Sequence, residues 1–138
     1  MSEENVAVVR SVYAALSRGD IEAALEWSAP DGEHDWSRSI GPYRGIYRGV
    51  DALRAFWTEF RDAVEDLTFD VEETIEAGPN VVAMVRVRIR GRGSGVEAVA
   101  RGPHLWTLKD GKVVRFVLFQ DKAEALEAVG LGTEMRPD

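Results

Sequence analysis

Residues 67–92 read LTFDVEETIEAGPNVVAMVRVRIRGR, and apolar side chains occupy every second position over most of this stretch. Alternation with a period of two is typical of strands that bury one face. Residues 78–80, Gly-Pro-Asn, interrupt the alternation with residue types that favour a turn. We therefore predict two antiparallel strands, residues 67–77 and 81–92, joined by a short hairpin.

The sheet continues downstream of this hairpin. Residues 96–108 and 112–120 are two further strand-like runs, separated by residues 109–111, Lys-Asp-Gly. Strands that follow one another through short glycine-containing turns form an antiparallel meander. A short helix over residues 121–129 closes the pattern.

The length of the loop at residues 109–111 decides which side chains share a face with His104. A two-residue turn places His104 with Arg115 and Val117. A three-residue loop, with a left-handed glycine in a bulge, places it with Phe116, Leu118 and Gln120. We expect the three-residue loop, because an apolar lining suits a pocket better than an arginine.

The chain before residue 67 has the period of helices. Apolar residues recur every three or four positions in three segments, which are residues 5–17, 21–27 and 52–64. Residues 29–32 have the composition of a turn, and residues 33–39 suit a short strand. Residues 41–49 combine glycines with Tyr43 and Tyr47, which predicts a loop rich in aromatic side chains.

This order of elements predicts an α+β domain. We expect three N-terminal helices packed in the concave face of a cone-shaped, curved antiparallel sheet. The 138 residues have the size of a single domain, residues 1–138. Its ordered core should cover about residues 3–130, followed by a frayed C-terminal tail. A bent sheet with helices in its hollow leaves room for a small ligand.

Composition excludes several classes of protein. The chain has no cysteine, so it has neither disulfides nor thiolate metal sites. It carries 17 basic and 24 acidic residues, and a net charge of −7 argues against a nucleic-acid partner. Its acidic first residues do not resemble a secretory signal, and no apolar run is long enough to cross a membrane. We expect a cytoplasmic protein with no membrane partner.

Three segments, taken in order, resemble one known family. Residues 8–20, VVRSVYAALSRGD, are similar to the first helix and Gly-Asp corner of the ketosteroid isomerases and SnoaL-like cyclases. Residues 48–57, RGVDALRAFW, resemble their entry to the third helix, and residues 110–114, DGKVV, resemble their last hairpin. The chain thus looks like a SnoaL-like, ketosteroid-isomerase-like member of the nuclear transport factor 2-like superfamily, a fold that hosts many reactions.

The resemblance implies positions for catalytic residues. Asp35 falls where the isomerases place their general base, and His104 falls where they place the aspartic acid that holds the oxyanion. Their oxyanion tyrosine corresponds to Val12, so Tyr13 should point elsewhere. SnoaL-like cyclases use an aspartate near the end of the last strand, where this chain has Gln120 and Asp121.

The residues themselves support these roles, and each also has a structural alternative. A carboxylate beside aromatic side chains loses solvation, so we expect a raised pKa that makes Asp35 a base near neutrality. A buried imidazole needs hydrogen-bond partners, and His104 can donate to a developing oxyanion. The structural alternatives are a surface aspartate for Asp35 and a core histidine for His104. For Asp121 the alternative is a helix cap, and we favour this cap over a catalytic role.

Further residues are candidates for ligand contact, although aromatic side chains at such positions are also ordinary core. They are Tyr13, His34, Trp36, Tyr43, Tyr47, Trp57, Trp106, Phe116, Leu118 and Gln120. On a strand, neighbouring side chains point to opposite faces, so only one of His34 and Asp35 should enter a pocket. These two residues and His104 lack the spacing of a metal site, and we expect no metal and no cofactor.

Four arginines alternate along one predicted strand: Arg86, Arg88, Arg90 and Arg92. The turn at residues 78–80 should place Arg86 near Glu72 and Arg88 near Asp70. Such cross-strand pairs contribute a few tenths of a kcal/mol, and we prefer this explanation to nucleic-acid binding.

The sequence therefore favours a small-molecule pocket protein. Our leading hypothesis is a cofactor-independent acid–base enzyme, such as an isomerase, cyclase, dehydratase or epoxide-hydrolase-like enzyme, that acts on a small hydrophobic compound. The alternatives are a binding module without turnover and a dimerisation module of the same fold. We also expect a homodimer through an apolar outer sheet face formed by Leu105, Thr107, Val113, Val117 and Phe119.

Overall fold

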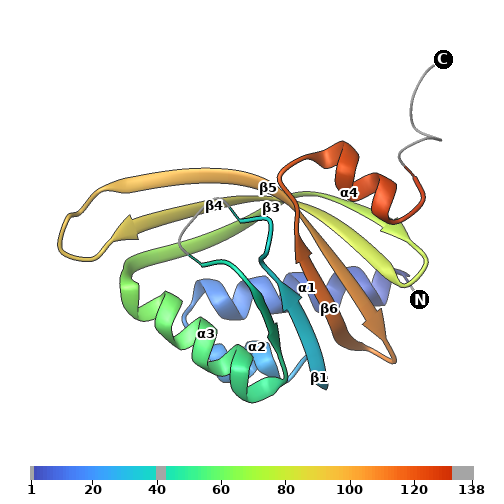
Figure 1. The fold of residues 1–138 in the computed structure, drawn as a ribbon, viewed down its shortest axis with the longest axis horizontal. Coiled ribbons are helices and arrows are strands. Elements are labelled where there is room, and N and C mark those ends of the chain that lie inside the picture. Colours follow the sequence, from blue (N-terminus) through green and yellow to red (C-terminus); the bar gives the residue numbers. More distant parts are fainter. Residues whose placement is uncertain (1, 40–42, 132–138) are drawn as a thin grey trace.

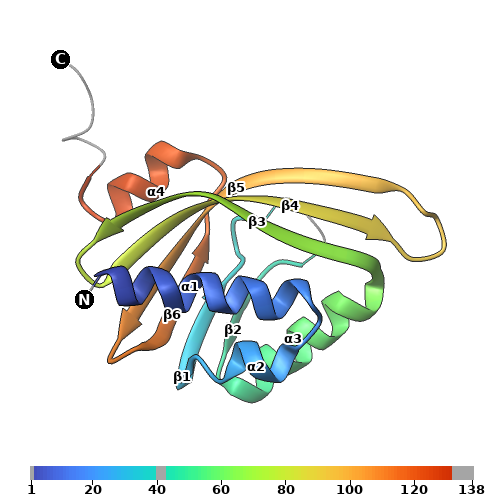
Figure 2. The ribbon, with the colours of Figure 1, turned by 180° about the vertical axis from the view of Figure 1, so that it is seen from behind.

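The computed structural model describes residues 2–39 and 43–131, and it confirms the α+β class. Six strands form one curved sheet in the order β2-β1-β6-β5-β4-β3. Helices α1, α2 and α3 lie on one side of it and α4 on the other (Figures 1 and 2). The elements are α1 (Ser2–Ser17), α2 (Ile21–Leu25), β1 (Ser28–Asp35), β2 (Ile46–Arg48), α3 (Val50–Ala63), β3 (Val64–Ala77), β4 (Asn80–Gly91), β5 (Glu97–Lys109), β6 (Lys112–Leu118) and α4 (Lys122–Ala128). None of the described helices is long and apolar enough to span a membrane.

Strand β1 differs from the sequence expectation in where it begins and in how it pairs. Residues 29–32 belong to β1, whose pairing with β6 is parallel and shifts in register between Ser28 and Glu33. The predicted turn is therefore an irregular stretch of strand. Gly32 permits it, because a Cβ atom there would lie 3.1 Å from the Val113 carbonyl oxygen and 3.2 Å from that of Ala29. The part of the predicted loop at residues 41–42 lies outside the described residues, and β2 occupies residues 46–48.

The β3–β4 hairpin forms as predicted, but its arginine pairs are shifted. The turn has two residues instead of three, since Ala77 pairs with Asn80, and the register slips once more between Val71 and Glu73. Arg86 therefore lies opposite Asp70 and Arg88 opposite Thr68. The predicted pairs of Arg86 with Glu72 and Arg88 with Asp70 are therefore wrong. A single extra residue in one strand moves every pair beyond it.

The β5–β6 hairpin has a two-residue turn, so the predicted three-residue loop is wrong. Leu108 pairs with Val113, and Asp110 and Gly111 have φ values of 52° and 77°, as a type I′ turn requires. The register then shifts between Thr107 and Leu108, which leaves Val114 as an extra residue. Because of this bulge His104 nevertheless lies opposite Leu118.

Two apolar clusters lie on opposite faces of the sheet. The larger one fills the space between the sheet and α1–α3 and includes Val113. The smaller one packs the Leu105, Val117 and Phe119 side chains under α4. The apolar outer face that motivated the predicted homodimer is thus largely covered by the chain's own last helix, and the dimer stays a prediction without that support.

Helix α4 begins after Asp121, whose carboxylate accepts a hydrogen bond from the Ala123 backbone N–H, as the cap hypothesis predicted. The predicted frayed tail lies mostly beyond residue 131, outside the described residues.

Candidate functional site

A cavity of about 580 Å³ opens between the end of α3 and the inner face of the sheet. Most of its wall is apolar and comes from α3, β3, β4, β5 and the segment after β6. The residues that line it are Trp36, Ser39, Tyr43, Phe60, Ala63, Val64, Phe69, Val87, Ile89, Ala100, Arg101, Gly102, His104, Leu118, Phe119 and Gln120. Its size is that of a typical small-molecule site.

Small residues on β5 help to keep this space open. Ala100, Gly102 and His104 alternate along the strand, so they share its inner face. Neither Ala100 nor Gly102 fills the hollow beside Val87 and Phe69. Small residues at alternate positions of a predicted strand were therefore a usable signal for the cavity, and the sequence analysis missed it.

His104 is the polar residue at the inner end of β5, and its ring is held in place by α1. The Tyr13 hydroxyl lies 2.6 Å from His104 Nδ1 and accepts a 2.8 Å hydrogen bond from Trp106 Nε1. The buried hydroxyl proton needs an acceptor, and Nδ1 lies 2.6 Å from the hydroxyl oxygen, so we assign this proton to the bond with Nδ1. The ring proton of His104 is then on Nε2.

Burial keeps this group of residues neutral. Desolvation lowers the pKa of His104 to about 3. The same cause raises the pKa of Tyr13 well above its usual value, against a smaller lowering by the Trp106 hydrogen bond. A neutral imidazole fixed at Nδ1 is a hydrogen-bond donor through Nε2 and a poor acceptor of a further proton. Tyr13 does not line the cavity, and its hydroxyl instead orients His104 from α1.

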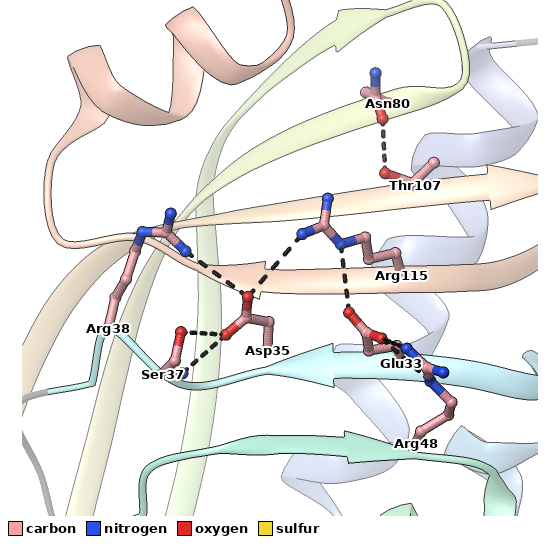
Figure 3. Close-up of polar contacts among 8 residues, drawn as sticks. All are labelled: Glu33, Asp35, Ser37, Arg38, Arg48, Asn80, Thr107 and Arg115. Atoms are coloured by element: carbon pink, nitrogen blue, oxygen red, sulfur yellow. Dashed lines mark hydrogen bonds and ion pairs between the residues drawn. The ribbon is translucent and has the colours of Figure 1, made fainter.

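Asp35 lies on the opposite face of β1 from His34, in a charged cluster (Figure 3). Its carboxylate accepts hydrogen bonds from the Ser37 backbone N–H and hydroxyl, at 2.9 and 2.6 Å. Arg38 and Arg115 lie 3.7 and 4.0 Å away. Burial alone would raise the pKa of Asp35, but the Ser37 hydrogen bonds and the two guanidinium groups outweigh it and lower the pKa. The predicted rise is wrong, and Asp35 is not among the cavity-lining residues.

His34 is the member of the pair that points inward. Its ring packs against Trp57, Trp106 and Phe116, with the Phe116 centroid 5.0 Å away. Burial lowers its pKa to about 3. His34 and Asp35 therefore face apart, and within residues 2–39 and 43–131 no three His, Cys, Asp or Glu side chains are grouped so that they could hold a metal ion.

The cavity brings together only part of the predicted site. Among the residues predicted to contact a ligand, the ones that line it are Trp36, Tyr43, Leu118 and Gln120, together with His104. Those that do not line it are Tyr13, His34, Tyr47, Trp57, Trp106 and Phe116, which pack in the core beside it. The inner-face residues of β3 and β4 were missed, although their period-two pattern placed them on one face.

The fold and cavity define a small α+β domain with a largely apolar hollow, and comparison with known proteins identifies the family. Residues 9–116 match the SnoaL-like domain family. The chain therefore belongs to the SnoaL-like domain family. No match was found among curated proteins.

Solved structures share the fold over nearly the whole chain. A nuclear transport factor 2-like protein of unknown function from Burkholderia pseudomallei is 26% identical, with a TM-score of 0.76, over 92% of this chain and 98% of that one. A protein from Shewanella denitrificans, described provisionally as a SnoaL-like polyketide cyclase, is 16% identical, with a TM-score of 0.74, over 94% and 97% of the two chains. A Mycobacterium tuberculosis protein in complex with estradiol-17β-hemisuccinate is 18% identical, with a TM-score of 0.74, over 86% and 95%.

Proposed function

We propose that this protein binds a small, largely apolar carbonyl compound in the cavity and polarises its oxygen through His104. The observation that carries the proposal is an apolar space of about 580 Å³ with a neutral imidazole at its wall. Apolar walls supply affinity, and a single fixed polar group supplies orientation. That a structurally similar protein was crystallised with a steroid ester is consistent with this ligand class.

The proposed chemistry is stabilisation of negative charge on the ligand oxygen. The N–H of a neutral imidazole donates a hydrogen bond to the ligand oxygen, and the ring itself carries no charge. The hydrogen bond from Tyr13 holds the ring in a fixed orientation. A preorganised donor in a dry site stabilises an enolate more than it stabilises the ketone. His104 would thus lower the barrier to enolisation, the common step of isomerase and cyclase chemistry.

A specific observation favours a second candidate, binding without turnover. Enolisation also needs a base, and the Asp35 carboxylate is held by Ser37, Arg38 and Arg115 rather than facing the cavity. The two candidates predict the same affinity and different rates of proton exchange.

Binding is tested with 2-acetylnaphthalene and its hydrocarbon counterpart 2-ethylnaphthalene by titration calorimetry. We expect the ketone to bind about 3- to 10-fold more tightly, the equivalent of one net hydrogen bond. His104→Leu should abolish this preference. Equal affinities in the unsubstituted protein would contradict the role of His104.

The cavity itself is tested with two substitutions on opposite faces of β5. Ala100 lines the cavity, whereas Val99 is on the other face and is 47% exposed. Ala100→Phe should weaken ketone binding at least about 10-fold by occupying the space, whereas Val99→Phe should leave it unchanged. Equal effects of the two would mean that the ligand binds elsewhere.

Turnover is tested by exchange of the acetyl protons of 2-acetylnaphthalene in D₂O, followed by proton NMR. Protein-dependent exchange that His104→Leu reduces about 100-fold would identify an enzyme. Binding without faster exchange would identify a binding module.

A further inference from the structure

Two side chains, His34 on the inner face of β1 and Trp36 directly after this strand, carry buried polar atoms without a partner. Among the described residues, four buried side-chain nitrogens lack any hydrogen bond: His34 Nδ1 and Nε2, Trp36 Nε1 and Arg86 Nε. Three of the four belong to His34 and Trp36, which are only 4% and 8% exposed. Both rings pack against Phe116, so these nitrogens belong to one region of the interior.

A purely structural role does not explain this arrangement. A buried polar group without a partner costs about 1–3 kcal/mol, and an apolar side chain of similar shape avoids that cost. The same fold satisfies its other buried histidine, since Tyr13 binds His104 Nδ1. Each unpaired buried group in a native protein calls for an explanation, and a polar group of a bound ligand supplies one.

One phenyl ring links these atoms to the cavity. The Phe116 ring centroid lies 5.0 Å from that of His34, 5.7 Å from Trp36 and 5.2 Å from His104. Trp36 and His104 line the cavity, whereas Phe116 and His34 do not. Phe116 therefore contacts His34 as well as both cavity-lining rings, and a ligand in the cavity reaches His34 only if this buried ring moves aside.

We propose that His34 and Trp36 form a second polar subsite, which binds a hydroxyl group at the end of the ligand opposite the oxygen held by His104. This inference rests on the proposed function and narrows the ligand to a rigid, largely apolar compound with two oxygen groups. The hydroxyl oxygen accepts from Trp36 Nε1–H, and its proton is donated to the unprotonated nitrogen of His34. A hydroxyl both accepts and donates, which matches the two kinds of unpaired nitrogen.

The test compares two ligands that differ only in the second oxygen: 2-acetylnaphthalene and 6-hydroxy-2-acetylnaphthalene. The quantity measured is the ratio of their dissociation constants. We expect the hydroxy ketone to bind about 10-fold or more tightly, as two net hydrogen bonds predict. Trp36→Phe and His34→Leu should each reduce this preference about 3- to 10-fold. Trp27→Phe, the same aromatic change outside the cavity, should leave the preference intact.

The outcomes separate this subsite from the proposed function. If the ketone binds and the hydroxy ketone binds no more tightly, the subsite is wrong and the cavity assignment stands. If the preference exists but survives both substitutions, His34 and Trp36 are not its source and the subsite is again wrong. If neither compound binds, the proposed function fails and this inference fails with it. Thermal denaturation checks that each variant folds.

Discussion

Neighbouring residues of β1 lie in opposite environments on the two faces of the strand. On the outer face, Glu33 and Asp35 form ion pairs with arginine side chains (Figure 3). On the inner side, His34 of β1 and Trp36, the residue after this strand, lie among aromatic rings, and their side-chain nitrogens have no partner within the described residues. One step along a strand thus changes the environment from an ion-pair cluster to an apolar interior.

This difference determines which chemistry each face offers. The lowered pKa of Asp35 makes it a weaker base than an ordinary aspartate. The lowered pKa values of His34 and His104, about 3, keep both imidazoles neutral. The outer face therefore supplies fixed charges, and the inner face supplies neutral hydrogen-bonding groups in a dry space, where they discriminate strongly between ligands.

The largest expected effect is acid destabilisation through the inner face. The folded-state pKa of each histidine is about 3, below the value of 6.5 expected in the unfolded chain. As the pH falls below about 6.5 the unfolded chain takes up protons that the folded protein does not, so stability is lost. Each histidine contributes about 1.4 kcal/mol per pH unit, and both together make the protein about 4 kcal/mol less stable at about pH 5 than at pH 7. Urea denaturation at each pH measures this change.

A single substitution sharpens this prediction. His34→Leu removes one of the two groups and should halve the loss between pH 7 and about pH 5. If the variant keeps the whole loss, His34 is not buried as a neutral imidazole, and the contrast between the two faces of β1 is wrong. The lowered pKa of Asp35 acts in the same direction only below about pH 4, outside this window.

The sequence was sufficient to predict the fold, because the fold depends on the periodicity of apolar residues along the chain. The change from a helical period to a period of two predicted the helices on one side and the meander that follows them. It did not predict the parallel pairing of β1 with β6, since that contact joins segments far apart in the chain. Residues 29–32 were assigned to a turn from Pro30 and Gly32, but Gly32 is there because another strand's backbone comes close.

The site was predicted less well because it depends on the face that each side chain takes. An extra residue in a strand reverses the faces beyond it, and neither the shift near Glu72 nor the bulge at Val114 has a sequence signature. His104 was placed correctly only because the error in the turn and the missed bulge cancelled. Asp35 was given the environment of its inward-facing neighbour, and composition alone could not reveal that Arg38 and Arg115 hold it.

Tyr13→Phe tests how the inner face satisfies one histidine and not the other. Removing the hydroxyl leaves Trp106 Nε1 and His104 Nδ1 without their present partner, so His104 comes to resemble His34. We expect the free energy of unfolding to fall by about 2–4 kcal/mol, measured by urea denaturation. Tyr47→Phe is the matched control, because its hydroxyl makes one exposed bond to the Arg44 carbonyl and its loss should cost less than about 1 kcal/mol. Equal costs would contradict the special position of Tyr13.

Asp35→Asn tests the outer face and has the smallest expected effect. Asparagine retains an oxygen for the Ser37 hydrogen bonds, and an uncharged NH2 group replaces the oxygen facing Arg38 and Arg115, whose side chains are 46% and 51% exposed. Because water screens such pairs, the cost at neutral pH should be about 1 kcal/mol or less. It should shrink further in high salt and vanish at a pH low enough to protonate the aspartate, whose stabilising contribution is lost as the pH falls through its lowered pKa.

The same variant shows whether Asp35 is only a partner of the outer-face arginines or also a catalytic base. If Asp35 serves only the outer face, Asp35→Asn leaves both ketone affinity and the rate of acetyl proton exchange as they are in the unsubstituted protein. A loss of exchange of about 100-fold with normal stability would instead mean that the carboxylate reaches the ligand. That result would reverse the contrast between the two faces, since the acid among the arginines would then be the group that removes the proton.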